Sequence, residues 1–153
     1  MDATQHHRAL EALYRAAPIN RFFEPHMTLS EGRAEITSDV RQEQFHTAGA
    51  LHGSAYFKLL DDACFFASNS LERERFVLTA SFTTYLLRPV SSGRLRSIGR
   101  VVHATRSQYL AEAELFDAAG ELIAKGSGTF VRGPQELAGI DAYASALEGK
   151  RTP

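Results

Sequence analysis

The amino-acid sequence predicts an α+β protein in which one antiparallel, curved sheet wraps around a single long helix. Residues 52–70 have a helical pattern that is apolar on nearly every side, and such a helix has to be enclosed by other elements. The hydrophobic period then changes from helical to alternating in four further segments, at 76–89, 94–106, 109–117 and 122–131. Short turns join these segments, which favours antiparallel pairing of consecutive strands.

Each remaining segment has a pattern of its own. One apolar stripe predicts an N-terminal helix over about 4–17, which Pro18 ends. Residues 27–40 alternate on both sides of the turn "SEG" and predict a hairpin. Helical spacing returns in a C-terminal tail over about 133–153. No repeat or linker interrupts the chain, so we expect one domain over 1–153 with its core at about 25–132.

The first strand after the long helix alternates regularly, which predicts two distinct faces. One face would carry Phe76, Leu78, Ala80, Phe82 and Leu86. The other face would carry Thr79, Ser81, Thr83 and Tyr85.

Composition excludes several classes of protein. A chain of 153 residues with 44% hydrophobic residues can form a globular core. The net charge of −1 gives no reason to expect a nucleic-acid partner. Cys64 is the only cysteine, so no intrachain disulfide can form, and no apolar run is long enough for a signal peptide or a membrane span. We therefore expect a soluble, cytoplasmic protein without a membrane partner.

Two adjacent acids, Asp61 and Asp62, interrupt the apolar helix. Lys58 precedes Asp62 by four residues, so an ion pair within the helix explains Asp62. The neighbours of Asp61 are mostly apolar, and an unpaired carboxylate there is costly unless it is hydrogen-bonded or serves chemistry. The pattern alone leaves open whether Asp61 faces water or reacts.

The loop before the helix supports a reactive role for Asp61. It contains His46, and then His52 and Gly53 at the expected start of the helix. Backbone N–H groups at a helix start have no partner within the helix and favour negative charge. Because glycine lets a substrate oxygen come close to them, the segment fits an oxyanion-binding site, although a simple bend at Gly53 and a local cap at His52 remain alternatives.

The segment "HGSAYFKLLD", from His52 to Asp61, resembles the motif of hotdog-fold acyl-CoA thioesterases of the PaaI type, named for phenylacetic acid degradation. Two later stretches, "LTASFTTYLLRPVSSGRL" and "AEAELFDAAGELIAKGSGTFV", are similar to strands of the same family. The resemblance covers about residues 25–132. It implies a hotdog fold, hydrolysis of an acyl-CoA thioester, and a homodimer or homotetramer with active sites between subunits.

The resemblance also implies roles for single residues. Asp61 falls on the catalytic carboxylate, and Gly53 falls on the glycine whose N–H polarises the thioester carbonyl. The chain departs from the family at three places: His46 replaces the usual Asn, Ser54 replaces a second Gly, and Arg106-Ser107 replaces a Gly-Arg/Lys pair.

Further candidate residues complete the expected site. Ser81 or Thr83 could hydrogen-bond Asp61 or the attacking water from the partner subunit, and His52 would orient the loop. Cations that could meet the phosphates of CoA are Arg88, Arg94, Arg106 and Lys125. Aromatic residues that could shape an acyl pocket are Tyr56, Phe57, Phe65 and Phe66. No cofactor is expected, because CoA is part of the substrate.

Three alternatives compete with a thioesterase. They are a hotdog hydratase or dehydratase, a non-catalytic acyl-CoA-binding protein, and a metal site made of His46, His52 and Asp61. The spacing of these three residues lacks the regularity of known ligand motifs, so we expect no metal.

Overall fold

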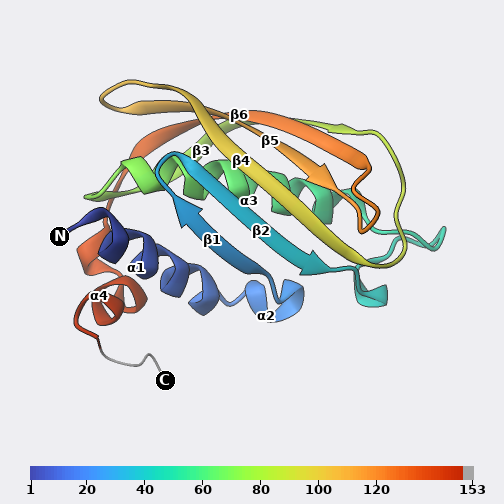
Figure 1. The fold of residues 1–153 in the computed structure, drawn as a ribbon, viewed down its shortest axis with the longest axis horizontal. Coiled ribbons are helices and arrows are strands. Elements are labelled where there is room, and N and C mark those ends of the chain that lie inside the picture. The colour runs from blue at the N-terminus through green and yellow to red at the C-terminus, as the bar shows by residue number, and fades with distance from the viewer. Residues whose placement is uncertain (150–153) are drawn as a thin grey trace.

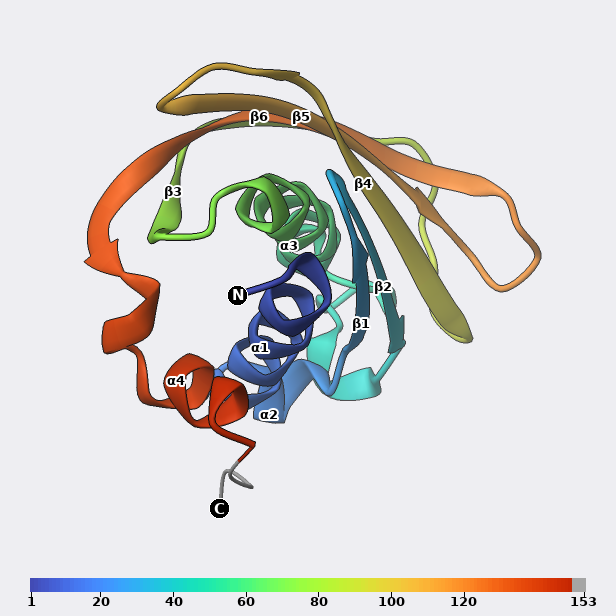
Figure 2. The same cartoon turned by 60° about the vertical axis from the view of Figure 1, so that its left-hand side comes forward.

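The computed structural model describes residues 1–149 and confirms the predicted α+β fold (Figure 1). Its six-stranded sheet has the order β1-β2-β4-β5-β6-β3, and all neighbours are antiparallel. The strands are β1 (His26–Ser30), β2 (Arg33–Asp39), β3 (Arg75–Leu86), β4 (Arg94–Ala104), β5 (Gln108–Phe116) and β6 (Leu122–Glu136). Figure 2 shows the sheet curving around the central helix α3 (Gly53–Leu71).

Short helical elements cover the open side of the sheet. Figure 2 shows α1 (Ala3–Ala16) and α4 (Asp141–Leu147) below α3, on the side that the sheet leaves free. The connections contain α2 (Asn20–Phe23) and two 3₁₀ turns, Gln42–Gln44 and Leu137–Gly139. No helix within residues 1–149 is long and apolar enough to cross a membrane.

The expectation that consecutive strands pair is wrong for β3. It pairs with β6 at one edge of the sheet, whereas β4 pairs with β2 and β5. Residues 87–93 carry the chain across the start of α3, where the Leu51 N–H donates to the Val90 carbonyl at 2.9 Å. β3 therefore begins near the end of α3 and ends near its first turn.

Central helix α3 lies directly on the backbone of β4. A Cβ atom added to Gly99 would be 2.4 Å from the Ala63 carbonyl carbon, so only glycine permits this approach. Residues Leu60, Ala63 and Cys64 are fully buried at this contact layer. The tight packing fixes the rotation of α3, and therefore fixes which of its residues face β3.

Two irregularities in β3 overturn its predicted faces. The register with β6 shifts between Arg75 and Val77 and again between Thr79 and Ser81. A bulge places two residues opposite one and so reverses the alternation beyond it. As a result Val77 and Thr79 face the helix before the second bulge, and Phe82 faces it afterwards, while Leu78 is 46% exposed.

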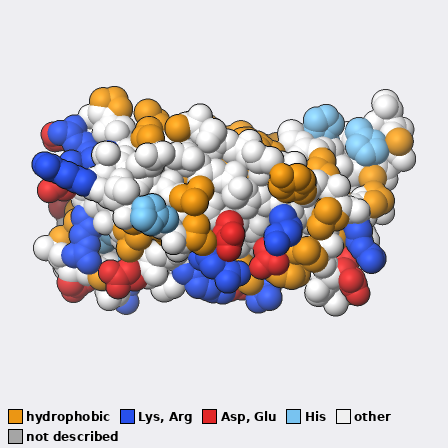
Figure 3. Space-filling view, turned by 90° about the horizontal axis from the view of Figure 1, so that it is seen from above, with side chains coloured by type: hydrophobic (Ala, Val, Ile, Leu, Met, Phe, Trp, Pro, Cys, Tyr) orange, Lys and Arg blue, Asp and Glu red, His pale blue; other side chains and the backbone are white. Residues whose placement is uncertain are grey.

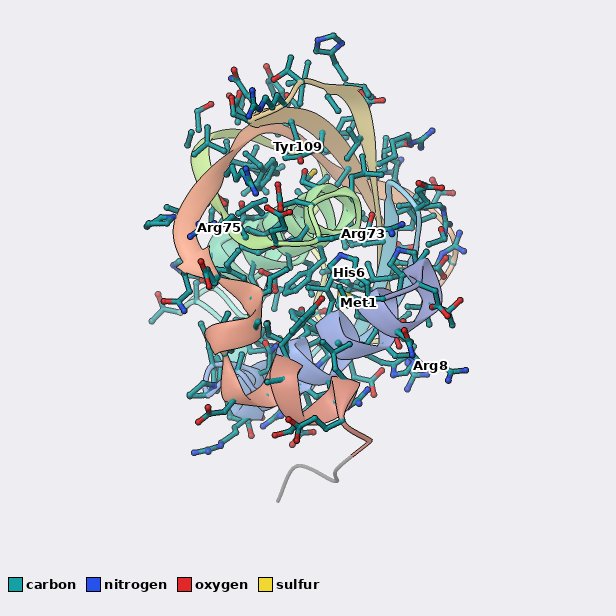
Figure 4. All side chains as sticks on the ribbon, turned by 90° about the vertical axis from the view of Figure 1, so that its left-hand side faces the viewer. Met1, His6, Arg8, Arg73, Arg75 and Tyr109 are labelled. Atoms are coloured by element: carbon teal, nitrogen blue, oxygen red, sulfur yellow. The ribbon has the colours of Figure 1, made fainter. Side chains whose placement is uncertain are left out.

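The last strand runs to Glu136, beyond the expected core end at residue 132. The C-terminal tail then forms α4, and residues 150–153 of the tail lie outside the described residues. Fully buried His6 joins α1 to both α3 and α4. Its Nε2–H donates to the Asn69 carbonyl at 2.8 Å, its Nδ1 accepts from the Tyr143 hydroxyl at 2.6 Å, and burial lowers its pKa. Figure 4 shows His6 between α1 and α3.

Candidate active site

One face of α3 and one strand form the site together. Gly53, Phe57 and Asp61 are spaced four residues apart and so share a stripe of the helix. β3 runs antiparallel beside this stripe, and three contacts match the two elements. The Leu86 side chain packs against Gly53, the Phe82 ring contacts the Phe57 ring, and the Thr79 hydroxyl hydrogen-bonds to Asp61.

Asp61 is half-buried and lies between aromatic side chains one turn before and after it. Burial raises the pKa of its carboxyl to about 6. The Thr79 hydroxyl donates to Oδ1 at 2.9 Å, which stabilises the ionised form and partly offsets this pKa increase. The neighbouring charges of Asp62 and Lys58 have smaller and opposite effects on the same pKa. Near neutral pH this carboxylate is ionised and still basic enough to accept a proton.

Asp62 has the structural role that the sequence predicts. It forms an i,i+4 ion pair with Lys58, whose ammonium group also lies over the Tyr14 ring. The Tyr14 hydroxyl donates to Asp62 Oδ2 at 2.7 Å, and burial raises the pKa of this hydroxyl. Asp62 is therefore occupied by partners from α1 and α3.

The start of α3 leaves one backbone donor free. His52 caps the helix, because its Nδ1 accepts from the Ser54 N–H at 3.0 Å and lies 2.8 Å from the Ser54 hydroxyl. The local cap that was one alternative for His52 is therefore present, and its partner is Ser54. Gly53 is the first helical residue, and within residues 1–149 its N–H has no hydrogen-bond acceptor. An oxygen of a substrate could accept from it.

A cavity of about 300 Å³ opens beside this free N–H. The cavity is lined by His46, whose side chain is exposed, and by Gly53, Tyr56 and Arg88. The Tyr56 hydroxyl donates to the Arg88 carbonyl at 2.7 Å and fixes that part of the chain. His46 Nδ1 accepts from the Ala48 N–H at 3.1 Å, so the loop orients its ring.

Several predicted residues lie away from this cavity in one chain. Arg106 is in the turn between β4 and β5, where the Ser107 carbonyl accepts from the Arg132 N–H, at the opposite end of α3 from Gly53. Ser81 and Thr83 are exposed on β3. The hydrogen bond to Asp61 within the chain comes instead from Thr79, which sequence analysis missed because no local signal marks the bulge.

Arg94 and Lys125, also predicted to bind the phosphates of CoA, lie on the outer face of the sheet. Figure 3 shows basic side chains on this face with acidic and apolar side chains beside them. Arg94 is paired with Asp39 at 2.8 Å, and Arg100 with Glu114 at 3.2 Å. Lys125 lines a small hollow together with Arg100, Glu112 and Glu114. The surface charge here is largely compensated.

Within residues 1–149 of one chain, His46, His52 and Asp61 are not grouped as the ligands of a metal ion. His52 Nδ1 is engaged by Ser54, and Asp61 lies two turns further along α3. Across residues 1–149, no three His, Cys, Asp or Glu side chains gather as metal ligands would.

Comparison with known proteins agrees with this fold. The model of the thioesterase superfamily matches residues 48–124, which contain the whole of α3 and the strands β3, β4 and β5. A candidate esterase of Saccharolobus solfataricus is 24% identical over 103 residues, which are 67% of this chain and 69% of that protein.

Solved structures extend the similarity to almost the whole fold. The Escherichia coli PaaI protein, from the phenylacetic acid degradation operon, matches with a TM-score of 0.80 at 20% identity, over 88% of this chain and 97% of that one. The conserved protein PA5202 of Pseudomonas aeruginosa matches with a TM-score of 0.70 at 28% identity, over 76% and 94%. The architecture is thus the hotdog fold of PaaI-like thioesterases. The chain belongs to the thioesterase superfamily.

Proposed function

We propose that the protein hydrolyses an acyl-CoA thioester to the free acid and CoA, with Asp61 as the reacting carboxylate and the Gly53 N–H as the oxyanion donor. The observation that carries this proposal is the state of Asp61. A carboxylate with its pKa raised to about 6 by burial, and with one oxygen fixed by Thr79, is suited to accept a proton at neutral pH. The cavity beside Gly53 supplies space for the thioester.

The distance between Asp61 and the Gly53 N–H within one chain implies that a second subunit completes each site. Asp61 follows Gly53 by eight residues of one helix, which is about 12 Å along the axis at 1.5 Å per residue. A single carbonyl group cannot be reached from both ends of this span, because a base acts within hydrogen-bond reach, directly or through one water. Each site would therefore combine Asp61 of one protomer with Gly53 of its partner.

The free edge of the sheet suits such a partner. β3 has a neighbour on one side only, so its other side presents unpaired backbone groups. Apolar side chains on or just after this strand are also exposed, namely Leu78, Tyr85, Leu86 and Leu87. A second copy that adds its own β3 antiparallel would cover them and bring Gly53 of one chain toward Asp61 of the other. A homodimer of this kind is the smallest active unit, and a homotetramer would be a pair of such dimers.

The reaction needs two bond changes at the carbonyl carbon. In the general-base route, Asp61 takes a proton from water while the water oxygen bonds to the carbonyl carbon, and the Gly53 N–H donates to the resulting oxyanion. The carbon–sulfur bond then breaks, and the CoA thiolate leaves and takes up a proton. In the alternative route the Asp61 oxygen itself attacks the carbonyl carbon, the carbon–sulfur bond breaks and the CoA thiolate leaves with a proton from solvent, and water then hydrolyses the resulting anhydride. Both routes use the same two groups.

Other residues would bind or position the substrate. His46 and Arg88 line the cavity beside Gly53, where an imidazole could position the carbonyl or the water and a guanidinium could meet a phosphate of CoA. Arg106 lies at the far end of α3, so it would serve a site only from another copy of the chain. Ser81 and Thr83, on the exposed edge strand, would likewise act across the interface.

A panel of acyl-CoA substrates, from short aliphatic to aryl, tests the proposed activity. We expect thiol release that depends on the enzyme and on the acyl group. Addition of water to an enoyl-CoA without thiol release would indicate a hydratase. Tight binding of CoA esters without turnover would indicate a binding protein. Either result would contradict the proposal.

Thr79→Val should change the pH dependence of this activity. The hydroxyl stabilises ionised Asp61, so its loss should raise the pKa of that carboxyl above about 6. The acid limb of the kcat/KM profile should then move to higher pH, while Thr79→Ser, which keeps the hydroxyl, should leave the limb in place. An unchanged limb in the valine variant would mean that Asp61 is not the titrating group.

A further inference from the structure

Two aromatic rings lie beside α3 between Gly53 and Asp61 of the same chain. Phe57 is one helical turn after Gly53 and one turn before Asp61 on the same stripe of α3. Its ring meets that of Phe82 edge to face, with centroids 5.5 Å apart and planes at 85°. An acyl group whose carbonyl carbon is within reach of Asp61 therefore has this ring pair as its neighbour on one side.

Phe82 forms a rigid support for this pair. Added Cβ atoms at Gly126 and Gly128 of β6 would each lie 2.5 Å from the Phe82 ring. The ring thus rests directly on the backbone of the neighbouring strand, and Phe130 packs against it at 6.4 Å. Side chains in such close packing do not yield to a ligand.

Phe57, in contrast, has a free surface. It is 43% exposed, and Phe82 is its one ring partner within the described chain. The aromatic neighbour on the other side of Asp61 is Phe65, whose ring is enclosed by Phe66, Phe76 and Phe130. Of the two rings that flank the carboxylate along the helix, only Phe57 presents an open apolar face to a substrate.

We propose that Phe57 determines acyl-group specificity, by closing the acyl pocket so that compact apolar acyl groups are accepted and long unbranched chains are excluded. This inference rests on the proposed thioesterase function. The fixed Phe82 ring forms the floor and the Phe57 ring forms the limiting wall. A compact acyl group gains contact area against this wall, whereas a longer chain collides with it.

Truncation of the Phe57 side chain should shift the substrate preference from short toward long acyl chains. In Phe57→Ala the ratio of kcat/KM for decanoyl-CoA to that for butyryl-CoA should rise about tenfold or more, since single-methylene discrimination in apolar pockets already spans about 10–200-fold. Phe57→Leu keeps an apolar side chain and the helix contact, so it should shift the ratio in the same direction by less. The KM for butyryl-CoA should rise more than its kcat falls.

Phe22 offers a closely matched control. It is 44% exposed and also meets a single aromatic neighbour edge to face, Phe23 at 5.1 Å, but it lies on α2. Phe22→Ala removes the same exposed ring without touching the site. The acyl-length ratio of this variant should equal that of the wild-type protein.

Three results separate the possibilities. An unchanged ratio in active Phe57→Ala and Phe57→Leu proteins would overturn the inference and leave the thioesterase function intact. Equal loss of activity for both substrates, together with dissociation into monomers by sedimentation, would assign Phe57 to the subunit contact and also overturn it. If the wild-type protein releases no thiol from either ester, the proposed function itself fails.

Discussion

Asp61→Asn is expected to lower kcat by a factor of about 10²–10⁴ and at the same time to stabilise the fold. The loss of activity follows because an amide can neither accept the proton of the attacking water nor act as a nucleophile. The gain in stability follows because burial has raised the pKa of this carboxyl from 3.8 to about 6, so its charged form is disfavoured in the native protein. Thiol-release kinetics and urea unfolding of the same variant measure both effects.

The stabilising effect has a defined pH dependence. In the unfolded chain Asp61 ionises near pH 3.8, whereas in the folded protein it holds its proton until about pH 6. The native state is thus favoured below pH 4, and this contribution is lost as the pH rises to 6. Relative to wild type, the asparagine variant should gain about 1–2 kcal/mol in free energy of unfolding above pH 6, after a discount for partial exposure, and little below pH 4.

Asp62→Asn is the matched control on the next residue. Asp62 holds the Lys58 ammonium and accepts from the Tyr14 hydroxyl, so the substitution should cost about 1 kcal/mol of stability and leave kcat near the wild-type value. Opposite signs of the stability change in the two variants would separate the acid that serves chemistry from the acid that serves structure. Retained activity in Asp61→Asn would remove Asp61 from the mechanism.

The sequence predicts the local elements of this fold well because they depend on local patterns. The long apolar helix over 52–70, the hairpin over 27–40 and the four later strands all appear close to their expected bounds. The partner of Asp62 is equally local, since Lys58 lies one turn before it. The order of the strands in the sheet does not depend on local patterns. β3 lies at the edge beside β6, although the short link at 87–93 has the pattern of an ordinary hairpin turn.

The candidate site shows the same division. Asp61 and Gly53 can be identified from the sequence alone. Asp61 is an acid within an apolar helix, and Gly53 is a glycine at the start of that helix. Thr79 could not be singled out. Strict alternation of β3 assigns it to the face of Ser81 and Thr83, but the bulge between Thr79 and Ser81 reverses the faces after it, so that Thr79 shares the helix-facing side with Phe82 and reaches Asp61. A single extra residue in a strand reverses every face assignment beyond it, and nothing in the composition of this strand announces it.

Gly53→Pro is expected to lower kcat by about 10²–10³, the effect of removing one oxyanion donor. Proline lacks the N–H but suits the first position of a helix, and His52 already has the extended conformation, with φ −63° and ψ 142°, that a residue before proline requires. Gly53→Ala is the control, because it adds a Cβ atom 3.0 Å from the flexible end of Leu86 and keeps the N–H. Similar kinetics of the two variants would mean that steric contact, and not the donor, accounts for any loss.

The same variant tests whether the site is shared between subunits. Asp61→Asn and Gly53→Pro each destroy both sites of a symmetric dimer, but in a mixed dimer one site combines the intact Asp61 of one chain with the intact Gly53 of the other. Co-expression of the two inactive chains should therefore restore about a quarter of the wild-type activity when chains associate at random. If both groups of a site came from one chain, every site in the mixture would carry one lesion, and mixing would restore nothing. Thiol release by the co-purified mixture, compared with each parent alone, decides between the two arrangements.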